Sequence, residues 1–232
     1  MDYSLVRWDE VKYIKFVNEL EKIREVKEKY SFNTNIGLKV LGIRTPVLKS
    51  VAKSIAKGDW KNFLKESDLK YYEELEIKGL VIGYIKADKE IIKEYVEIFI
   101  NKIDNRSLCD NFIKNLKIIE KDKEYFFPFI TEKSRSDNHW KIRFALIIFS
   151  KYYIEKQYIN NIFTICSEIK NKNYYVQTAQ TILISAIYLK YRNEMLEYLK
   201  NNTLDKIVQK IRSSYQVTEE EKENIKLFRK WN

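Results

Sequence analysis

Apolar residues recur every three or four positions along most of the chain, which is the spacing of one face of an α-helix. The first run extends from Trp8 to about Lys29, and no later run shows the strict alternation of a half-buried strand. The pattern predicts about a dozen helices. After the first they are expected at residues 45–58, 69–85, 89–103, 107–118, 124–133, 140–154, 157–169, 174–191, 194–199, 204–214 and 219–231.

Several helix ends carry their own signals. Thr45 followed by Pro46 predicts a helix with Thr45 as N-cap and Pro46 at the first helical position. Gly58 is expected to cap the end of the same helix, because a residue without a Cβ adopts the left-handed conformation easily. The stretch Ser31–Leu41, which contains Gly37, is the least periodic part of the chain and is expected to be a loop.

Three further signals lie in the second half of the chain. Asp137 is expected to cap the helix that starts at Trp140, and Pro128 is expected to bend or interrupt the helix that contains it. Thr218 and Glu221 have the spacing of a capping box, in which each side chain bonds to the backbone of the other residue.

The predicted helices form pairs that recur at about the 40-residue period of HEAT-like repeats. Only five glycines and two prolines are present, and no Gly-, Pro- or Ser-rich linker separates the pairs. We therefore predict an all-α fold, an α-α superhelix or solenoid of HEAT-like repeats, as a single domain over residues 1–232.

Composition excludes several classes of protein. No apolar run reaches about 18 residues and the N-terminus lacks a signal-peptide pattern, so we expect a soluble, cytoplasmic protein without membrane contact. Cys109 and Cys166 have neither metal-ligand nor disulfide-framework spacing and are expected to be buried thiols. A single histidine, His139, argues against a histidine metal site or a Ser-His catalytic pair. No metal and no cofactor are therefore expected.

The chain is strongly basic, with 43 Lys and Arg against 33 Asp and Glu and a net charge of +10. Such a surplus favours a polyanionic partner, because basic surfaces attract phosphate backbones. The alternatives are ordinary solvated helix faces and a biased amino-acid usage. Positively charged candidates for a DNA-binding surface are Lys49, Lys53, Lys141, Lys210 and Arg212.

Asp110 and Arg143 each place one charge in an otherwise apolar helical pattern. An ionised group is rarely buried unless it is paired or functional. If the helices pack side by side, the two residues can share a concave face, where a carboxylate beside a phosphate-reading arginine forms a site. The alternative is a structural ion pair that joins two helices.

Five segments of the chain are informative as an ordered set: Leu41-Gly-Ile-Arg-Thr-Pro-Val-Leu-Lys49, Tyr71-Tyr-Glu-Glu74, Leu108-Cys-Asp110, Trp140-x-x-Arg143 and Tyr175-Val-Gln177. In this order they resemble the bacterial DNA alkylation repair family, the AlkD-like HEAT-repeat alkylpurine DNA glycosylases. The C-terminal segment from Lys210 to Glu220 is also similar to that family's ending.

The resemblance implies a solenoid that holds double-stranded DNA on its concave face and removes positively charged N3- or N7-alkylated purines. It implies that Asp110 stabilises the oxocarbenium-like sugar and positions water, and that Arg143 contacts the DNA backbone. It also implies two tryptophans packed on the sugar and neighbouring backbone. Trp140, in the arginine motif, and Arg106, beside the aspartate, join the lysines above as expected DNA-binding residues.

The sequence departs from the family at both tryptophans, which are replaced by Arg106 and Ile182. A salt bridge from Arg106 can neutralise Asp110. Three hypotheses follow: a monomeric glycosylase that acts on alkylated DNA, a non-catalytic DNA-binding relative that recognises distorted or branched DNA, and a protein-binding HEAT scaffold.

Overall fold

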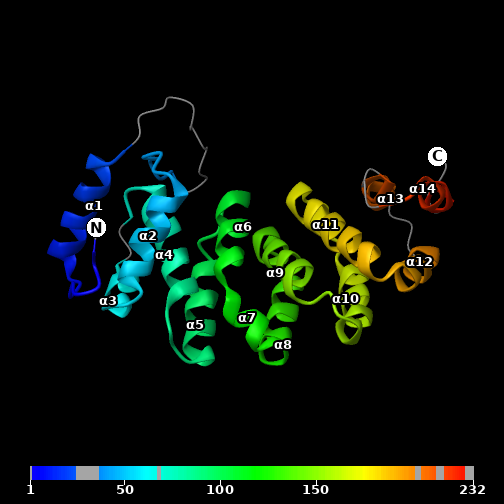
Figure 1. Cartoon of the computed structure of the whole chain (residues 1–232), viewed down its shortest axis with the longest axis horizontal. Helices are drawn as coiled ribbons and strands as arrows, with labels where there is room; N and C mark the ends of the chain where they lie inside the picture. Colours follow the sequence, from blue (N-terminus) through cyan, green and yellow to red (C-terminus); the bar gives the residue numbers. More distant parts are fainter. Residues whose placement is uncertain (1, 25–36, 67–68, 202–204, 213–216, 228–232) are drawn as a thin grey trace. The chain divides into compact units, whose positions relative to one another are not determined.

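The computed structural model describes residues 2–24, 37–66, 69–201, 205–212 and 217–227, which fold almost entirely as α-helices (Figure 1). Among these residues the only β-type pairing is an isolated bridge between Lys39 and Tyr71. The prediction of an all-α fold built of helical repeats is confirmed. The first helix, predicted to extend to about Lys29, ends at Lys22 with Ile23 as its C-cap. Residues 25–36, which include most of the expected loop 31–41, lie outside the described residues.

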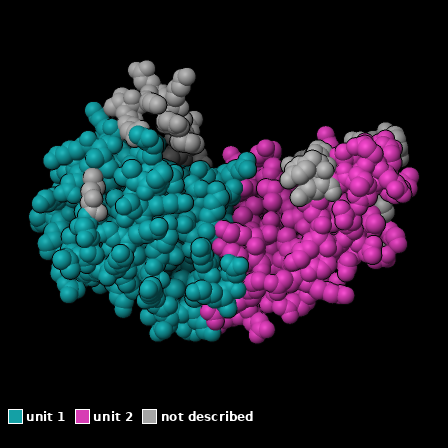
Figure 2. Space-filling model, in the orientation of Figure 1, with its two compact units in different colours: residues 1–121 teal, residues 122–232 magenta. Residues whose placement is uncertain are grey.

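The chain forms two compact units, Met1–Lys121 and Asp122–Asn232 (Figure 2). Unit 1 contains α1 (Glu10–Lys22), α2 (Thr45–Ile55), α3 (Trp60–Lys65), α4 (Tyr72–Tyr84), α5 (Lys89–Ile100), α6 (Arg106–Asn115) and α7 (Lys117–Lys121). Unit 2 contains α8 (Lys123–Ser134), α9 (His139–Tyr152), α10 (Lys156–Glu168), α11 (Tyr174–Lys190), α12 (Arg192–Asn201), α13 (Asp205–Arg212) and α14 (Glu219–Lys226). A single domain over the whole chain stays a prediction.

In unit 1, α4 and α6 run parallel. One hydrogen bond joins the first turns of the two helices, and another joins their last turns. The Tyr72 hydroxyl at the start of α4 donates to Oδ1 of Asn105, the N-cap of α6, at 3.4 Å. The Tyr84 hydroxyl at the end of α4 donates to Oδ1 of Asn115 at the end of α6, at 3.3 Å. Alternate helices that run parallel are the arrangement expected of stacked helix pairs.

A buried carboxylate fixes α2 beside α4. Glu73, which is 2% exposed, accepts the backbone N–H of Leu41 at 3.0 Å and that of Gly42 at 2.7 Å. Gly42 has φ of 77°, a left-handed conformation that suits glycine. Near the other ends of the two helices the Lys53 ammonium lies 5.5 Å from the centre of the Tyr84 ring. The helices α2, α4 and α6 therefore form a parallel set, called here the inner row of unit 1.

The core of unit 1 contains a cluster of aromatic rings and one buried lysine. The Phe63 ring lies 4.9 Å from Trp8 and 5.6 Å from Phe16, measured between ring centres. Lys78, which is 2% exposed, donates to the Phe63 carbonyl at 2.7 Å. Burial lowers the pKa of Lys78 to about 7, and the charge of Lys102 adds to this effect.

In unit 2, α9 and α11 are likewise parallel neighbours. The rings of Trp140 and Tyr175, in the first turns of the two helices, lie 4.6 Å apart. Near the other ends, Nζ of Lys190 donates to the Ile154 carbonyl at 2.9 Å. Helix α8 also packs on α9, and α12 and α13 pack on α11.

The ends of α2 differ from the prediction in two respects. The N-cap is Arg44, not Thr45, and no side chain caps the helix; Thr45 is its first residue, with Pro46 directly behind. Gly58 does not have a left-handed backbone. A Cβ at that position would lie 2.4 Å from the carbonyl oxygen of Ser4, so the close approach of two backbones requires glycine there.

The N-terminal caps of α9 and α14 were also predicted, and only the second is as expected. α9 is capped by Asn138, not Asp137, because the Asn138 oxygen accepts the N–H of Trp140 at 2.8 Å. The capping box of Thr218 and Glu221 is confirmed by bonds of 2.8 Å and 3.3 Å.

Two predicted helices differ in their continuity. α8 continues through Pro128, which lies in the middle of the helix, so the expected interruption does not occur although the proline lacks the N–H of one ladder bond. The helix expected at 107–118 breaks at Leu116 into α6 and α7. Cys109 and Cys166 are buried thiols, as predicted, and burial raises the pKa of Cys166 to about 12.

Gly83 allows α4 and α6 to approach closely. A Cβ there would lie 2.7 Å from Cβ and 2.9 Å from the carbonyl oxygen of Asn115. We expect Gly83→Ala to lower the free energy of unfolding by about 1–3 kcal/mol, because backbone must move. Alanine's better helix propensity, worth about 1 kcal/mol, acts in the opposite direction. Denaturant unfolding measures the difference. Ser50→Ala, at an exposed α2 position, is the control, and a Gly83 variant more stable than wild type, as helix propensity alone predicts, would contradict this account of the packing.

Candidate functional site

The inner row of unit 1 carries a line of polar side chains from one helix to the next. Asn111 of α6 donates from Nδ2 to Oε1 of Glu76 in α4 at 3.3 Å. Lys49 of α2 is close enough to Glu76 for its positive charge to favour the ionised carboxylate. Lys49, Glu76 and Asn111 therefore mark one polar face that spans the three helices. Asp110 is the residue before Asn111 in α6.

Asp110 lies in the second turn of α6, whose start is fixed by the Asn105 side chain accepting the Leu108 N–H at 2.9 Å. The Asp110 side chain is 24% exposed, and its Oδ2 lies 3.4 Å from Nε of Arg106. Arg106 is 58% exposed, so this is a surface ion pair one helical turn apart, of a kind that contributes little free energy. The carboxylate is therefore accessible, and Arg106 can leave it at small cost.

Glu76 was not found from the sequence. Burial raises the pKa of Glu76, and the negative charge of Glu73 raises it further; the bond from Asn111 and the charge of Lys49 act in the opposite direction. The only sequence signal is that Glu73 and Glu76 stand three residues apart and so share a helix face. Its proximity to Asn111 depends on how α4 packs on α6, which spacing within one helix does not reveal.

Of the predicted phosphate-binding lysines, two lie on the inner row. Lys49 and Lys53 are both exposed and stand one turn apart on α2. The Lys53 ammonium also lies over the Tyr84 ring of α4, so the lysine side chain extends from α2 toward α4. The inner row thus brings Lys49 and Lys53 to the helix set that carries Asp110.

Arg143, in unit 2, is fully buried in α9. Its Nη1 donates to the Tyr175 carbonyl at 3.0 Å and to Oγ1 of Thr178 at 3.3 Å. Both acceptors belong to the first turns of α11, so the guanidinium holds α9 and α11 together. Its role as a DNA contact stays a prediction.

Trp140 is also buried, with 6% of its surface exposed, and its ring packs at 34° on the Tyr175 ring. His139 lies 4.9 Å from Trp140, between ring centres. Tyr174, beside Tyr175, is 66% exposed and is the most accessible ring of the group. The start of α9 and the start of α11 therefore share an aromatic cluster with one open ring.

The remaining basic candidates lie in unit 2. Lys141 is half-buried and lines a hollow of about 670 Å³ together with Lys133 and Arg135. Arg212 is half-buried in α13, and its Nε has no hydrogen-bond partner among the described residues. Lys210 belongs to the same helix, but its side chain lies outside the described part of the structure.

Within the described ranges no group of three His, Cys, Asp or Glu side chains is placed to hold a metal ion. No helix in that part of the chain has the length and apolar character needed to span a lipid bilayer.

Comparison with protein-family models matches residues 17–230 to the family described as DNA alkylation repair enzyme. The chain belongs to the DNA alkylation repair enzyme family. The match covers almost every helix of both units, including those that carry Asp110 and Arg143. Comparison with curated proteins and with solved structures gave no match.

Family membership makes the positions of Arg106 and Ile182 informative, because the resemblance implies a tryptophan at each. Arg106 is exposed at the start of α6, one turn before Asp110. Ile182 is half-buried in α11. Neither residue offers an aromatic face, and within α6 Arg106 stands beside the aspartate.

The buried position of Arg143 predicts a large effect on stability. Arg143→Ala should lower the free energy of unfolding by about 3 kcal/mol, because it opens a cavity and removes two hydrogen bonds to α11. Thermal or denaturant unfolding tests this. Arg135→Ala, which removes an exposed ion pair with Glu168, is the matched control and should cost less than about 1 kcal/mol. Equal stability of the two variants would show that Arg143 has no structural role.

Proposed function

We propose that this protein binds double-stranded DNA and releases positively charged N3- or N7-alkylated purines, with Asp110 as the catalytic carboxylate. Family membership supports a role in DNA alkylation repair. The observation that carries the finer proposal is the partial exposure of the Asp110 carboxylate on α6, a helix of the inner row whose next residue, Asn111, is linked to α4.

The chemistry requires little from the protein beyond a well-placed negative charge. In a cationic alkylpurine the bond between the sugar C1′ and the base nitrogen breaks with its electron pair moving to the base, which leaves as a neutral molecule. Water then adds to C1′ and loses a proton to solvent. A carboxylate stabilises the positive charge that develops on the sugar, and electrostatic stabilisation of this kind is often the largest catalytic effect.

Exposed basic residues support the proposed DNA contact. Lys49 and Lys53 on α2 and Arg106 on α6 lie on the helices of the inner row, and the chain has a net charge of +10. Lysine and arginine that neutralise backbone phosphates supply most of the sequence-independent affinity for DNA. In unit 2, Lys141 is the accessible predicted contact, whereas Arg143 and Trp140 serve the packing of α9 on α11.

A second candidate is a family member that binds DNA without cleaving it. The observation in its favour is the contact between Arg106 and Asp110, in which a positive side chain stands beside the carboxylate where the resemblance implies a tryptophan. An ion pair on the carboxylate reduces the negative charge available to the sugar. The two candidates differ in base release but agree in DNA binding.

Asp110→Asn should reduce the release of 7-methylguanine and 3-methyladenine from methylated duplex DNA by about 100-fold or more, because the negative charge is lost. Affinity for the same DNA should change by no more than about twofold, since a single charge contributes modestly. Base release is measured by chromatography against an enzyme-free control.

Asp88→Asn is the matched control, because Asp88 is an exposed aspartate at the start of α5 and makes no side-chain cap. It should release bases at the wild-type rate. Salt-sensitive DNA binding without base release by the wild type would instead identify the non-catalytic family member.

DNA affinity should fall steeply with salt, with a slope of about −0.9 in log K against log salt concentration for each phosphate neutralised. The double variant Lys49→Ala, Lys53→Ala should make this slope shallower by about 2. Fluorescence anisotropy of a labelled duplex gives both slopes. Lys65→Ala, at an exposed position of α3, should leave the slope unchanged. A flat response for the wild type would favour a protein-binding scaffold.

A further inference from the structure

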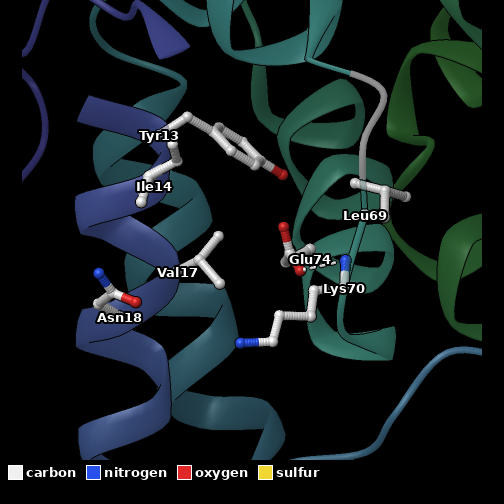
Figure 3. A pocket seen from close by; sticks show the side chains of 7 residues that line it. All are labelled: Tyr13, Ile14, Val17, Asn18, Leu69, Lys70 and Glu74. Atoms are coloured by element: carbon white, nitrogen blue, oxygen red, sulfur yellow. Dashed lines mark hydrogen bonds between the residues drawn. The ribbon is translucent and has the colours of Figure 1, made fainter. Parts of the chain in front are cut away.

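The hollow between α1 and the start of α4 in unit 1 contains two buried polar groups, Tyr13 and Glu74, which bind each other (Figure 3). Tyr13 is 4% exposed and Glu74 is fully buried. Burial raises the pKa of Tyr13, and the negative charge of Glu74 and the hydrogen bond to it raise this pKa further. The two groups therefore serve the packing of α1 on α4 and are not open to a ligand.

A different surface, formed by exposed side chains, lies in unit 2 at the start of α11. Residues 169–173, which connect α10 to α11, are not helical, and from there into the first turn of α11 every second residue is exposed. Alternation of this kind places the exposed side chains on one side of the chain, as in extended backbone. The exposed residues are Lys170, Lys172 and Tyr174.

The backbone of this segment is fixed by side chains of the residues in between. Oδ1 of Asn171 accepts the N–H of Asn173 at 2.9 Å, and Oδ1 of Asn173 accepts the N–H of Tyr175 at 2.8 Å. The buried Arg143 donates to the Tyr175 carbonyl at 3.0 Å. The exposed side chains therefore stand on a backbone that is held in place before a partner arrives, which reduces the entropy lost on binding.

Tyr174 is 66% exposed, whereas every other aromatic side chain in the part of the chain that the structure describes is buried or half-buried. Its ring meets the Tyr175 ring edge to face, with the ring centres 5.5 Å apart, and Tyr175 packs in turn on Trp140. The cluster supports the Tyr174 ring from one side and leaves most of it open. A tyrosine ring loses little conformational freedom on binding and offers a face for stacking.

The charges beside this ring favour an anionic partner. Lys170 and Lys172 make no ion pair within the described ranges. Of the acidic residues beside the segment, Glu168 is bonded to Arg135 at 3.1 Å, and Asp137 lines a hollow of about 350 Å³ together with Lys170. Lys172, two residues before the exposed ring, is therefore the cation best placed to meet a phosphate next to it.

We propose that Tyr174 and Lys172, with Lys170 beside them, bind an unpaired base of a DNA strand. The base stacks on the open part of the Tyr174 ring, and the lysines contact the phosphates that flank the base. Aromatic rings beside basic side chains bind single strands in this way. A base inside an intact duplex is stacked on its neighbours and does not reach such a ring.

The role of the family in DNA alkylation repair favours DNA over other anions as the partner. The site goes beyond the proposed function, because it requires neither an alkylated base nor any residue of the inner row of unit 1.

The probe is a single-stranded oligonucleotide of about ten nucleotides, with thymidines on both sides of a central 2-aminopurine, whose fluorescence is quenched by stacking. The full-length wild type should bind it saturably and quench it. Tyr174→Ala should bind it about tenfold more weakly and quench it less, because the stacking of one base contributes on this scale. Tyr174→Phe keeps the ring and should stay within about twofold of the wild-type affinity.

Two comparisons separate stacking from general effects of mutation. Ile98→Ala, which removes a 49% exposed apolar side chain of α5, is the matched control and should bind the probe as the wild type does. A blunt duplex of the same length should bind Tyr174→Ala and the wild type equally, because its bases are paired.

The contact with phosphates is tested by the salt dependence of the same binding. Lys172→Ala should make the slope of log affinity against log salt concentration shallower by about 0.7 for the single strand. Lys156→Ala, at the exposed first residue of α10, should leave this slope unchanged. An unchanged slope in Lys172→Ala would remove that lysine from the site.

The unfolding curve of each variant shows whether it is folded, and Tyr174→Leu carries the test if Tyr174→Ala is not. The proposal is overturned if the wild type does not bind the single strand at low salt, or if loss of the ring leaves that affinity unchanged. An equal loss of affinity for the single strand and the duplex overturns it as well.

Base release from methylated duplex DNA is measured separately, so the two proposals fail independently. A protein that binds the single strand through Tyr174 but releases no base contradicts only the proposed function. A protein that releases bases but binds single strands equally well without the ring contradicts only the inference drawn from Tyr174.

Discussion

The buried carboxylate of Glu73 holds the start of α2 against the start of α4, and the polar face of unit 1 depends on it. Its bonds to the backbone of Leu41 and Gly42 turn the chain so that α2 leaves parallel to α4. Lys49 then stands near Glu76 and, through Asn111, next to the helix of Asp110. Removing one partner of a buried charge is strongly destabilising, so α2 and its lysines have little freedom to shift along α4.

Helix existence could be predicted from the sequence because amphipathic periodicity depends only on the residues within a helix. The exact ends of the helices were harder to predict, because adjacent residues can compete for the same capping position. Asp137 and Asn138 are both suitable caps for α9, and the structure has Asn138 there. Pro128 lies in the middle of α8, and the helix continues through it although its nitrogen donates no ladder bond. The predicted capping role of Gly58 was wrong, because the C-cap of α2 is Ala56 and glycine is needed at position 58 for its contact with Ser4, which lies far away in the sequence.

The candidate site could be predicted only in part. Asp110 was located by the resemblance, and its exposure at the surface of α6 agrees with a residue that meets a ligand. Glu76 was missed because Asn111 and Lys49 come from other helices. For Arg143 the pattern correctly indicated a charge in an apolar helix. Its acceptors in α11 are a backbone carbonyl and a hydroxyl. Because neither is charged, they could not be predicted by looking for an oppositely charged residue in the sequence.

Burial of Lys78 makes the folded protein release a proton that the unfolded chain keeps. Its pKa falls from 10.5 to about 7, so between these pH values the unfolded state binds more protons and folding becomes more favourable as the pH rises. Tyr13 and Tyr72 act in the opposite sense, because burial raises each pKa above 10.0 and the unfolded chain ionises first at higher pH. The contribution of these three groups to stability is therefore greatest in mildly alkaline solution, between the titration of the buried lysine and that of the unfolded tyrosines.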